Sequence, residues 1–513
     1  MRGRAEGGAP GKMSTPDSRA AGAMLGLAIG DALGLPVDFG SRAERLADPV
    51  TGLRAAAAWG GGPGSWSGET SLALRQAESI LASGFDPGDF GQRALAWLDA
   101  GGRGAGPIAL GGAVGRSLGR IRGGLPAVLS GGRGENDNGN AALVRILPAS
   151  IWLAAMPDPL RWRALAAFSA LTHGHPRCFL AAWIHSLVAS GLLGGSSPAD
   201  AYAAAVDAAR AALPQMHHAL RAEAEHFGRI LGGKLAALPA SDLRGSGYVV
   251  HNLEAGLWCL LTGADFGACV LSAVNLGENA KASAATAGGL AGLAHGREGL
   301  PRDWVAQLDK AEEIEATGLA LAALVEAPTP VPGSYRILPG KLFAGPHPLA
   351  PQRGVEGDST ETRLSAILDS GIDGILDLTE DGETLGGRAV PQYWKEYETL
   401  AARRGMGVER RRLSIADMST AGGGVIGRAL GEIDAMLAAG RRVYVHCLGG
   451  TGRTGTIVGA WLIERGLASP SEAIGLLAAL RSASGAPDRA SPETDGQRAA
   501  VIGWRPGPSA LTV

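Results

Sequence analysis

The stretch VYVHCLGGTGRTG, residues 443–455, decides the fold of the last third of this 513-residue chain. Alternating β-branched and aromatic residues lead into a glycine-rich loop, and an apolar run from Thr456 to Ile463 follows it. This pattern predicts a strand, a tight loop and a helix. The backbone N–H groups of such a loop converge at the helix N-terminus, which favours an anion.

A cysteine and an arginine lie at the two ends of this loop, Cys447 and Arg453. The loop amides and the helix dipole favour the thiolate, which is the reactive form of cysteine. The planar arginine fork matches two oxygens of a phosphate. The spacing therefore predicts a phosphate site whose amides come from the five intervening residues, Leu448, Gly449, Gly450, Thr451 and Gly452.

The signature His-Cys-x5-Arg-Thr resembles the cysteine-dependent protein phosphatases, in particular the dual-specificity group. The resemblance implies that Cys447 is the nucleophile, that Asp417 is the general acid and then the base, and that Thr454 hydrogen-bonds the sulfur as it leaves. It also implies that His446 orients the cysteine. The alternatives are a structural cysteine beside a solvated arginine, and an aspartate that only caps a loop.

A second polar loop near the C-terminus, SPETDGQ at residues 491–497, resembles the glutamine-bearing loop of related phosphatases. Gln497 would then position a water. An exposed helix cap is an equally good interpretation of the same segment.

Composition and charge bound the class of protein. The chain has 46% hydrophobic and 19% charged residues, which is typical of a globular protein, and its length predicts two or three domains. The net charge of −2 provides no overall field that would attract nucleic acid or an anionic membrane. Four cysteines without C-x-x-C spacing indicate a reducing compartment, and we expect a cytoplasmic protein.

Shifts in composition along the sequence divide the chain into four segments. Residues 1–18 are rich in Gly, Pro and charge, without the apolar core of a signal peptide, and predict a disordered tail. Residues 19–325 carry long apolar-periodic segments between short turns, which predicts an all-helical domain. Residues 326–333 hold three prolines and predict an extended linker. Residues 334–513 alternate strand-like and helical pieces, which predicts an α/β domain with the phosphatase signature.

The helical domain carries four motif islands, whose order is its most specific feature. They are GAMLGLAIGDALG with PVDF from residue 22, WSGETS from residue 66, NGN with LVRILP and LTHGHP from residue 138, and GSGY with AVNLGENAKAS from residue 245. Together they resemble the ADP-ribosylglycohydrolase family, which implies an all-helical fold that removes ADP-ribose from protein side chains with two Mg²⁺ ions.

The family's metal-ligand positions are changed in this sequence. The family pattern Thr-Asp-Asp-[ST] corresponds to a segment that includes Ser67 and Glu69, and Asp38 stands where the family usually has Glu. The ligand places of the last island hold Asn279, Lys281 and Ala282. An ammonium has no acceptor atom and repels a divalent ion. We therefore expect no metal and no other cofactor.

Lys281 has two interpretations. Its ammonium, paired with Glu69 or Asp38, could stand in for the lost metal in a pocket that accepts ADP-ribose, or it could be a lysine tolerated in a decayed site. The sequence thus leaves three functional hypotheses. The chain is a phosphatase of phosphoproteins or small phosphoesters with an inactive helical domain, or that domain binds ADP-ribose or an ADP-ribosylated protein without metal, or both domains are active hydrolases.

Overall fold

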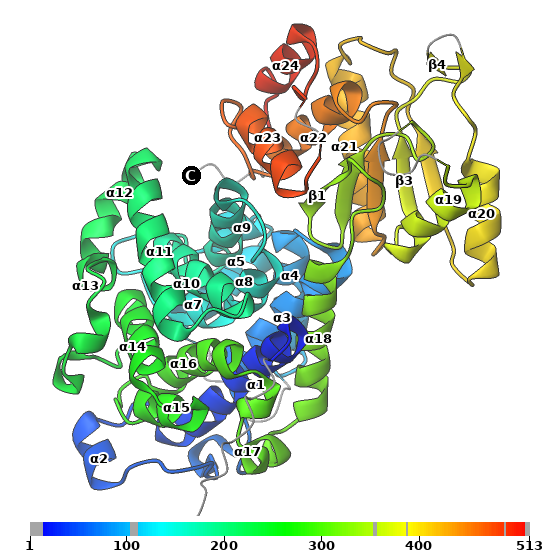
Figure 1. The fold of residues 1–513 in the computed structure, drawn as a ribbon. Helices are drawn as coiled ribbons and strands as arrows, with labels where there is room; N and C mark the ends of the chain where they lie inside the picture. Colours follow the sequence, from blue (N-terminus) through cyan, green and yellow to red (C-terminus); the bar gives the residue numbers. More distant parts are fainter. Residues whose placement is uncertain (1–13, 103–110, 352–356, 386–387, 487–488, 508–513) are drawn as a thin grey trace, which may run out of the picture.

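The computed structural model describes residues 14–102, 111–351, 357–385, 388–486 and 489–507. A helical region is followed by an α/β region (Figure 1). The first helix, α1, begins at Pro16 because the Thr15 hydroxyl accepts the Ser18 N–H and proline suits the first turn. The last three residues of the predicted tail are therefore helical, and residues 1–13 lie outside the described part.

The helical region is built from α-helices joined by short turns and 3-10 segments. Its α-helices are α1 (Pro16–Gly34), α2 (Arg42–Ala47), α3 (Gly68–Ser83), α4 (Pro87–Asp99), α5 (Gly112–Arg122), α6 (Ala127–Ser130), α7 (Ala141–Arg145), α8 (Leu147–Trp152), α9 (Asp158–Ala170), α10 (Pro176–Leu193), α11 (Pro198–Ala212), α12 (His218–Glu223), α13 (Gly228–Leu231), α14 (Val249–Thr262), α15 (Phe266–Val274), α16 (Ala280–His295), α17 (Arg302–Gln307) and α18 (Ala311–Glu326). The 3-10 segments are η1 (Leu35–Val37), η2 (Ala57–Trp59), η3 (Leu213–Gln215), η4 (Ala224–Phe227), η5 (Leu235–Ala237), η6 (Ala240–Asp242) and η7 (Arg297–Gly299).

The close approach of α1 and α16 brings two of the motif islands together. A Cβ added to Gly26 would meet the backbone of Gly288, and one added to Gly34 would meet the backbone of Lys281. Glycines four residues apart lie on one face of a helix, so the two backbones touch along a stripe. The end of α1, and the acidic residues after it, are therefore held against the first turn of α16.

Two helices, α1 extended through Val37 and α10, are long and apolar enough to cross a membrane by length and composition alone. The windows that pass this test are 94% and 78% buried inside the fold. A core helix passes the same test, so this finding says little about membranes.

The α/β region follows a connector, residues 327–334, that has neither helix nor strand. Ala327 and Val331 of this connector are buried. The elements after it are β1 (Tyr335–Leu338), β2 (Leu342–Gly345), α19 (Thr360–Asp369), β3 (Gly374–Asp377), β4 (Thr384–Leu385), β5 (Arg388–Ala389), α20 (Trp394–Arg403), β6 (Glu409–Arg412), α21 (Gly423–Ala438), β7 (Val443–His446), α22 (Gly452–Glu464), α23 (Ala473–Ala483) and α24 (Asp495–Ile502).

Five of these strands form one sheet in the order β1-β2-β7-β3-β6. Strand β1 is antiparallel to β2, and the other neighbours are parallel. The register places His446 at the end of β7 between Gly345 and Asp377. The signature loop therefore leaves the sheet from its centre, at the carboxyl ends of parallel strands, where ligands bind in open α/β sheets.

Alternating residues of the central strands face two separate cores. Phe343, Tyr444 and Ile375 pack in the same cluster as residues of α19 and α20. Their neighbours Leu342, Val445 and Leu376 belong to the cluster of α21, α22 and α23. The period of two expected for a strand explains this division. Figure 1 shows α19 and α20 on one side of the sheet and α21 to α24 on the other.

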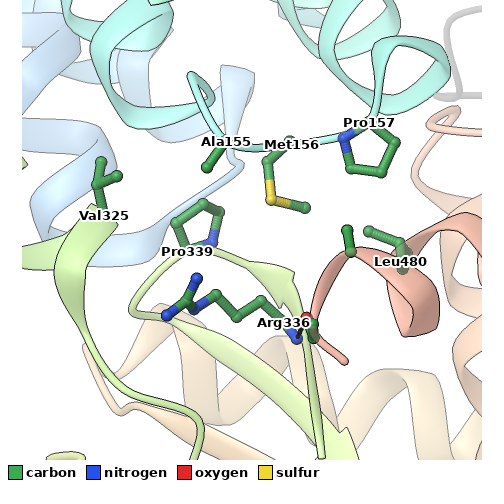
Figure 2. Close-up of a pocket in the computed structure, with 9 residues that line it drawn as sticks. Ala155, Met156, Pro157, Val325, Arg336, Pro339 and Leu480 are labelled. Atoms are coloured by element: carbon green, nitrogen blue, oxygen red, sulfur yellow. Dashed lines mark hydrogen bonds between the residues drawn. The ribbon is translucent and has the colours of Figure 1, made fainter. Parts of the chain in front are cut away.

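The two regions share one continuous apolar core, which includes residues of α1, α8 and α18 and of the α/β region. Trp152 Nε1 donates to Pro339 O at 2.9 Å, and Lys341 Nζ donates to Leu81 O and Ala82 O at the end of α3, at 2.5 and 2.9 Å. Figure 2 shows a small pocket at this boundary, between Met156 on the helical side and Arg336 and Leu480 on the other. The domains therefore pack directly against one another.

Candidate functional site

The signature loop surrounds a buried cysteine. Cys447 is 2% exposed, and the Gly450 N–H donates to its sulfur at 3.3 Å. Gly450 has a φ of 72°, and a Cβ there would meet the backbone of Gly345, so this turn requires glycine. Helix α22 begins at Gly452, two residues after this turn. The loop therefore directs the backbone amide of Gly450 at the sulfur, just before the helix begins.

The guanidinium of Arg453 is fixed by acidic partners and one carbonyl. Its two terminal nitrogens donate to Glu383 at 2.7 and 2.6 Å, one of them also donates to Ile415 O at 3.0 Å, and the other lies 3.0 Å from Asp417 Oδ1. Burial opposes the charge, but the bonds to Glu383 and the nearby Cys447 and Asp417 raise the pKa of Arg453. The arginine is therefore a permanent cation in a preset orientation.

Two buried polar atoms of α22 have no hydrogen-bond partner among the described residues, Arg453 Nε and the Thr454 hydroxyl. Such atoms are costly unless a ligand or water pairs with them. Nε lies on the edge of the guanidinium that Glu383 leaves open. Both atoms come from the first turn of the helix that follows Cys447, so both suit a bound oxyanion or the sulfur itself.

Glu383 is a site residue that the sequence analysis missed. It lies in a polar loop before the short β4-β5 hairpin, and its side chain is 6% exposed. Burial raises its pKa, but the bonds from Arg453 lower it further, so the pKa of Glu383 lies below its ordinary value. Glu380 and Asp381 stand beside it in the sequence, and no local pattern marks which of the three acids reaches the arginine.

The predicted general acid, Asp417, lies at the mouth of the loop. Its side chain is 57% exposed, and Oδ1 lies 3.0 Å from Arg453. Residues 413–420, which we call the acid loop, leave β6 and cross the signature loop; Ile415 N donates to Leu378 O at 3.2 Å. The structure thus brings Asp417, Cys447 and Arg453 together, with Thr454 on the same first turn.

His446 belongs to a buried network behind the cysteine. Its Nδ1–H donates to the Cys447 carbonyl at 3.1 Å, so Nε2 accepts from the Tyr393 hydroxyl at 2.6 Å. Burial lowers the pKa of His446, although Asp377 opposes this. The imidazole is therefore neutral, and each ring nitrogen has one partner. Tyr393 precedes α20, far from the signature, and the sequence analysis did not find it.

The remaining residues of the signature loop are fixed by their neighbours. Leu448 O accepts from His347 N at 3.0 Å, and Thr451 Oγ1 donates to Glu493 at 3.1 Å. Gln497 is 1% exposed and forms a reciprocal capping box with Thr494 at the start of α24. The helix-cap interpretation of Gln497 is therefore correct, but the residue is buried rather than exposed.

The second island of the helical region forms the start of α3 around Asp31. Both carboxylate oxygens of Asp31 accept bonds: Ser67 N and Oγ at 2.9 and 2.7 Å, and Thr70 N and Oγ1 at 3.1 and 2.8 Å. Ser67 is the N-cap of α3, which starts at Gly68. Its side chain accepts the Glu69 N–H, which satisfies one of the free amides of the first turn.

Lys281 lies buried at the start of α16, with its Nζ 3.1 Å from Asp38 Oδ2. The structure thus pairs Lys281 with one of the two acids considered from the sequence. Asn279 Nδ2 donates to the other oxygen of Asp38 at 3.3 Å. The rings of Phe39 and Trp59 lie 5.7 and 5.8 Å from Nζ. Burial lowers the pKa of Lys281, but the charges of Glu69, Asp38 and Asp31 raise it above its ordinary value.

A model of the ADP-ribosylglycohydrolase family matches residues 12–331. The chain belongs to this family. A second model, described as a polymorphic toxin system DSP-PTPase phosphatase, matches residues 353–467. Both resemblances are confirmed, as is the fold: an all-helical ADP-ribosylglycohydrolase domain precedes an α/β phosphatase domain.

Relatives match each domain separately. The ADP-ribosylarginine hydrolase Tri1 of Pseudomonas putida (strain GB-1) is 30% identical over 58% of this chain and 76% of its own length. The ADP-ribosyl-[dinitrogen reductase] glycohydrolase of Rhodospirillum rubrum is 29% identical over 58% of this chain and 92% of its own length.

The phosphatase domain matches the phosphatidylglycerophosphatase and protein-tyrosine phosphatase 1 of Mus musculus, which is 34% identical over 23% of this chain. The match spans only 56% of that relative. Among solved structures, one described as an ADP-ribosylglycohydrolase-related protein complex is 30% identical, with a TM-score of 0.49, over 60% of this chain and 98% of its own.

The residues of the ADP-ribosylglycohydrolase site do not fit the two Mg²⁺ ions that the family implies. The three ligand places of the last island hold the ammonium of Lys281, the methyl group of Ala282 and the amide of Asn279, whose oxygen already accepts from Asn140 at 2.7 Å. Within the described ranges, no group of three or more His, Cys, Asp or Glu side chains is placed to hold a metal ion. An ammonium bonded to Asp38 and a methyl group offer no oxygen ligand.

Proposed function

We propose that the chain is a cysteine-dependent phosphomonoester phosphatase that acts through a phosphocysteine intermediate. The proposal rests mainly on two buried polar atoms that have no hydrogen-bond partner in the part of the chain that the structure describes, Arg453 Nε and the Thr454 hydroxyl. Both lie on the first turn of α22, the helix that follows Cys447 and its loop. A phosphate oxygen and the sulfur are the groups that these donors suit.

In the first step the Cys447 thiolate attacks phosphorus, and the P–O bond to the leaving group breaks. Asp417 donates its proton to the departing oxygen, while the loop amides and Arg453 hold the other phosphate oxygens. In the second step water attacks the phosphocysteine, Asp417 accepts the proton, and phosphate leaves. The Thr454 hydroxyl, which has no other partner among the described residues, donates to the sulfur as the S–P bond breaks.

The substrate class follows from the loop residues and from the relatives. Residues 448–452 contain no lysine or arginine, so the loop adds no charge beyond Arg453. This favours a phosphoprotein or a small phosphoester over a substrate with several phosphates. The phosphatase relative is described as acting on phosphatidylglycerophosphate and on protein tyrosine, and both are phosphomonoesters of the proposed class.

The experiment is hydrolysis of an aryl phosphate by the full-length protein in the presence of a chelator. We expect turnover without metal, and complete loss of turnover in Cys447→Ser. Undiminished hydrolysis by Cys447→Ser would contradict the proposal. Asp417→Asn should lose most activity on substrates whose leaving group needs a proton.

For the helical domain we propose loss of ADP-ribosyl hydrolase activity, because the metal-ligand places are filled by Lys281, Ala282 and Asn279. Its relatives are described as hydrolases of ADP-ribosylated arginine and dinitrogen reductase. The test is release of ADP-ribose from an ADP-ribosylated protein with added Mg²⁺. Release that Glu69→Ala abolishes would contradict this proposal and establish two active hydrolases.

A specific observation favours a second function for this domain, binding of ADP-ribose without metal. A pocket of about 320 Å³ is lined by Phe39, Ser246, Gly247, Glu278 and Asn279. The buried Lys281 ammonium lies 5.7 Å from the centre of the Phe39 ring that lines it. Calorimetry with ADP-ribose should show the same affinity with and without Mg²⁺, weakened by Lys281→Met. No binding at millimolar ligand would exclude this function.

A further inference from the structure

The side-chain oxygen of Gln497 already accepts two hydrogen bonds, which argues against the water-positioning role that the sequence suggests. Oε1 accepts from Glu493 N and Thr494 N, both at 3.1 Å. An amide oxygen has two lone pairs, so none is left to position a water. On the other side of the amide, Nε2 donates to Ser419 O at 3.1 Å. Gln497 therefore links the first turn of α24 to the acid loop.

The acid loop is held at both of its ends. On the side of Ile415, the carbonyl oxygen accepts from Arg453 at 3.0 Å. On the side of Ser419, the carbonyl oxygen accepts from Gln497. Asp417 lies between these two attachments, and its neighbour Met418 has a φ of 57°, a conformation that a residue with a Cβ keeps only when its surroundings hold it.

The packing around Gln497 makes this attachment short and rigid. A Cβ added to Gly496 would lie 2.5 Å from the Thr420 hydroxyl, so α24 touches the acid loop directly. A Cβ added to Gly452 would lie 3.0 Å from both amide heteroatoms of Gln497, so the same side chain also lies against the start of α22. One buried amide thus contacts both parts of the site, the acid loop and the signature loop.

We propose that Gln497 is a positioning residue that holds the acid loop, and with it the Asp417 carboxylate, over Cys447. This inference rests on the proposed phosphatase function. The general acid of this protein is therefore kept in place by α24 and need not swing in from an open position when substrate binds. The contribution of Gln497 is confined to the two proton transfers of Asp417, to the leaving group and from the attacking water.

The test compares substrates by the acidity of their leaving group. Gln497→Met keeps the length of the side chain and removes both its donor and its acceptor. The measured quantity is the single-turnover rate of leaving-group release, which isolates the first step from hydrolysis of the phosphocysteine. We expect this rate to fall about tenfold or more for an alkyl phosphate, which needs the general acid, and to change little for an aryl phosphate with an acidic phenol. An equal loss for both substrates would overturn the proposal, since it would indicate damage to the signature loop.

A double-mutant cycle with Asp417→Asn makes the test specific. If Gln497 acts through Asp417, Gln497→Met should cause no further loss of alkyl phosphate turnover in the Asp417→Asn background. Independent, multiplying losses would contradict the inference. Absence of Cys447-dependent hydrolysis in the unmodified protein is a separate outcome, which overturns the proposed function itself.

Two further variants keep the test valid if Gln497→Met folds poorly. Gly496→Ala introduces a methyl group against Thr420 and should give the same selective loss, whereas Gly475→Ala in α23, which meets nothing within 4 Å, should not. Thr494→Ala removes the cap bond to Gln497 N, at 3.2 Å, without touching Ser419. It should lower stability and leave the leaving-group dependence unchanged; selective loss in Gly475→Ala or Thr494→Ala would count against the proposed contact.

Discussion

The proposed chemistry of the phosphatase domain depends on the hydrogen bonds that Arg453 and the Cys447 sulfur make and on those they leave open. Glu383 orients Arg453 but leaves Nε open, and the sulfur of Cys447 accepts only one loop N–H among the described residues. The open positions are those that a phosphate would fill. The site is therefore preorganised, which is the condition for strong electrostatic stabilisation of a transition state.

Tyr393 is the residue whose role is tested most simply. In Tyr393→Phe the Nε2 of His446 loses its donor, which leaves a buried acceptor without a partner behind the Cys447 carbonyl. A hydrogen bond of this kind is worth about 1 kcal/mol, which corresponds to a loss of about fivefold in kcat/KM for an aryl phosphate.

The matched control is Tyr397→Phe, which removes an equally buried hydroxyl of the same region that donates to Ile372 O at 2.7 Å. It touches neither His446 nor the loop. An unchanged kcat/KM in Tyr393→Phe, or the same loss in Tyr397→Phe, would contradict the role assigned to Tyr393.

At the scale of elements, α3 runs from the ADP-ribosylglycohydrolase site to the phosphatase domain. Its N-terminus carries Ser67 and Glu69 beside Lys281, and the carbonyls at its C-terminus hold Lys341, the residue before β2. Burial raises the pKa of Glu69 to about 7, while Lys281 lowers it and Asp31 and Asp38 raise it further. Three acidic side chains, Glu69, Asp38 and Asp31, therefore lie near a single lysine, Lys281.

The pH dependence of stability reveals this surplus of acid. The folded state binds more protons than the unfolded state between the ordinary glutamate pKa of about 4.5 and the folded value of about 7. Stability therefore falls as the pH rises through this window. Glu69→Gln should unfold at higher urea than the unmodified protein at pH 8, and the difference should shrink toward pH 4.

A surface glutamate provides the control for this measurement. The side chain of Glu225 is 82% exposed, so Glu225→Gln should leave the urea midpoint unchanged at both pH values. If Glu69→Gln behaves like Glu225→Gln, the carboxyl of Glu69 is not destabilised by its surroundings and the interpretation of this site is wrong.

At the scale of the whole molecule, the two domains share a core and should unfold together. Lys341 joins them and is 4% exposed; burial and the nearby Arg442 lower its pKa to about 8, although Asp373 opposes this. Between pH 8 and the ordinary lysine value of 10.5 the unfolded state binds more protons, so stability rises with pH. Lys341→Met should lack this rise.

Calorimetry of the unmodified protein and of Lys341→Met checks both predictions, the joint unfolding of the domains and the rise of stability with pH. We expect one cooperative transition for the unmodified chain, because its apolar core continues from the helical domain into the phosphatase domain. Two separate transitions at pH 7, or the same pH dependence in Lys341→Met, would contradict the account of the interface.

The sequence predicted those parts of the structure that depend on local spacing. Cys447, Arg453 and the strand-loop-helix around them follow from one segment. The motif islands left Glu69 and Asp38 as candidate partners of Lys281, and the structure pairs it with Asp38. Glu383 and Tyr393 were missed because sheet pairing and the β4-β5 hairpin bring them to the site from distant positions. Their partners are set by tertiary packing, which no local pattern encodes.

The most direct measurement of the central claim is trapping of the covalent intermediate. Asp417→Asn, mixed with an aryl phosphate that has a good leaving group, should form the phosphocysteine faster than it hydrolyses it. Acid quenching and intact-mass analysis should then show one added phosphoryl group, mapped to Cys447 by peptide sequencing. Turnover with no adduct at Cys447, or with the adduct on another residue, would contradict the account.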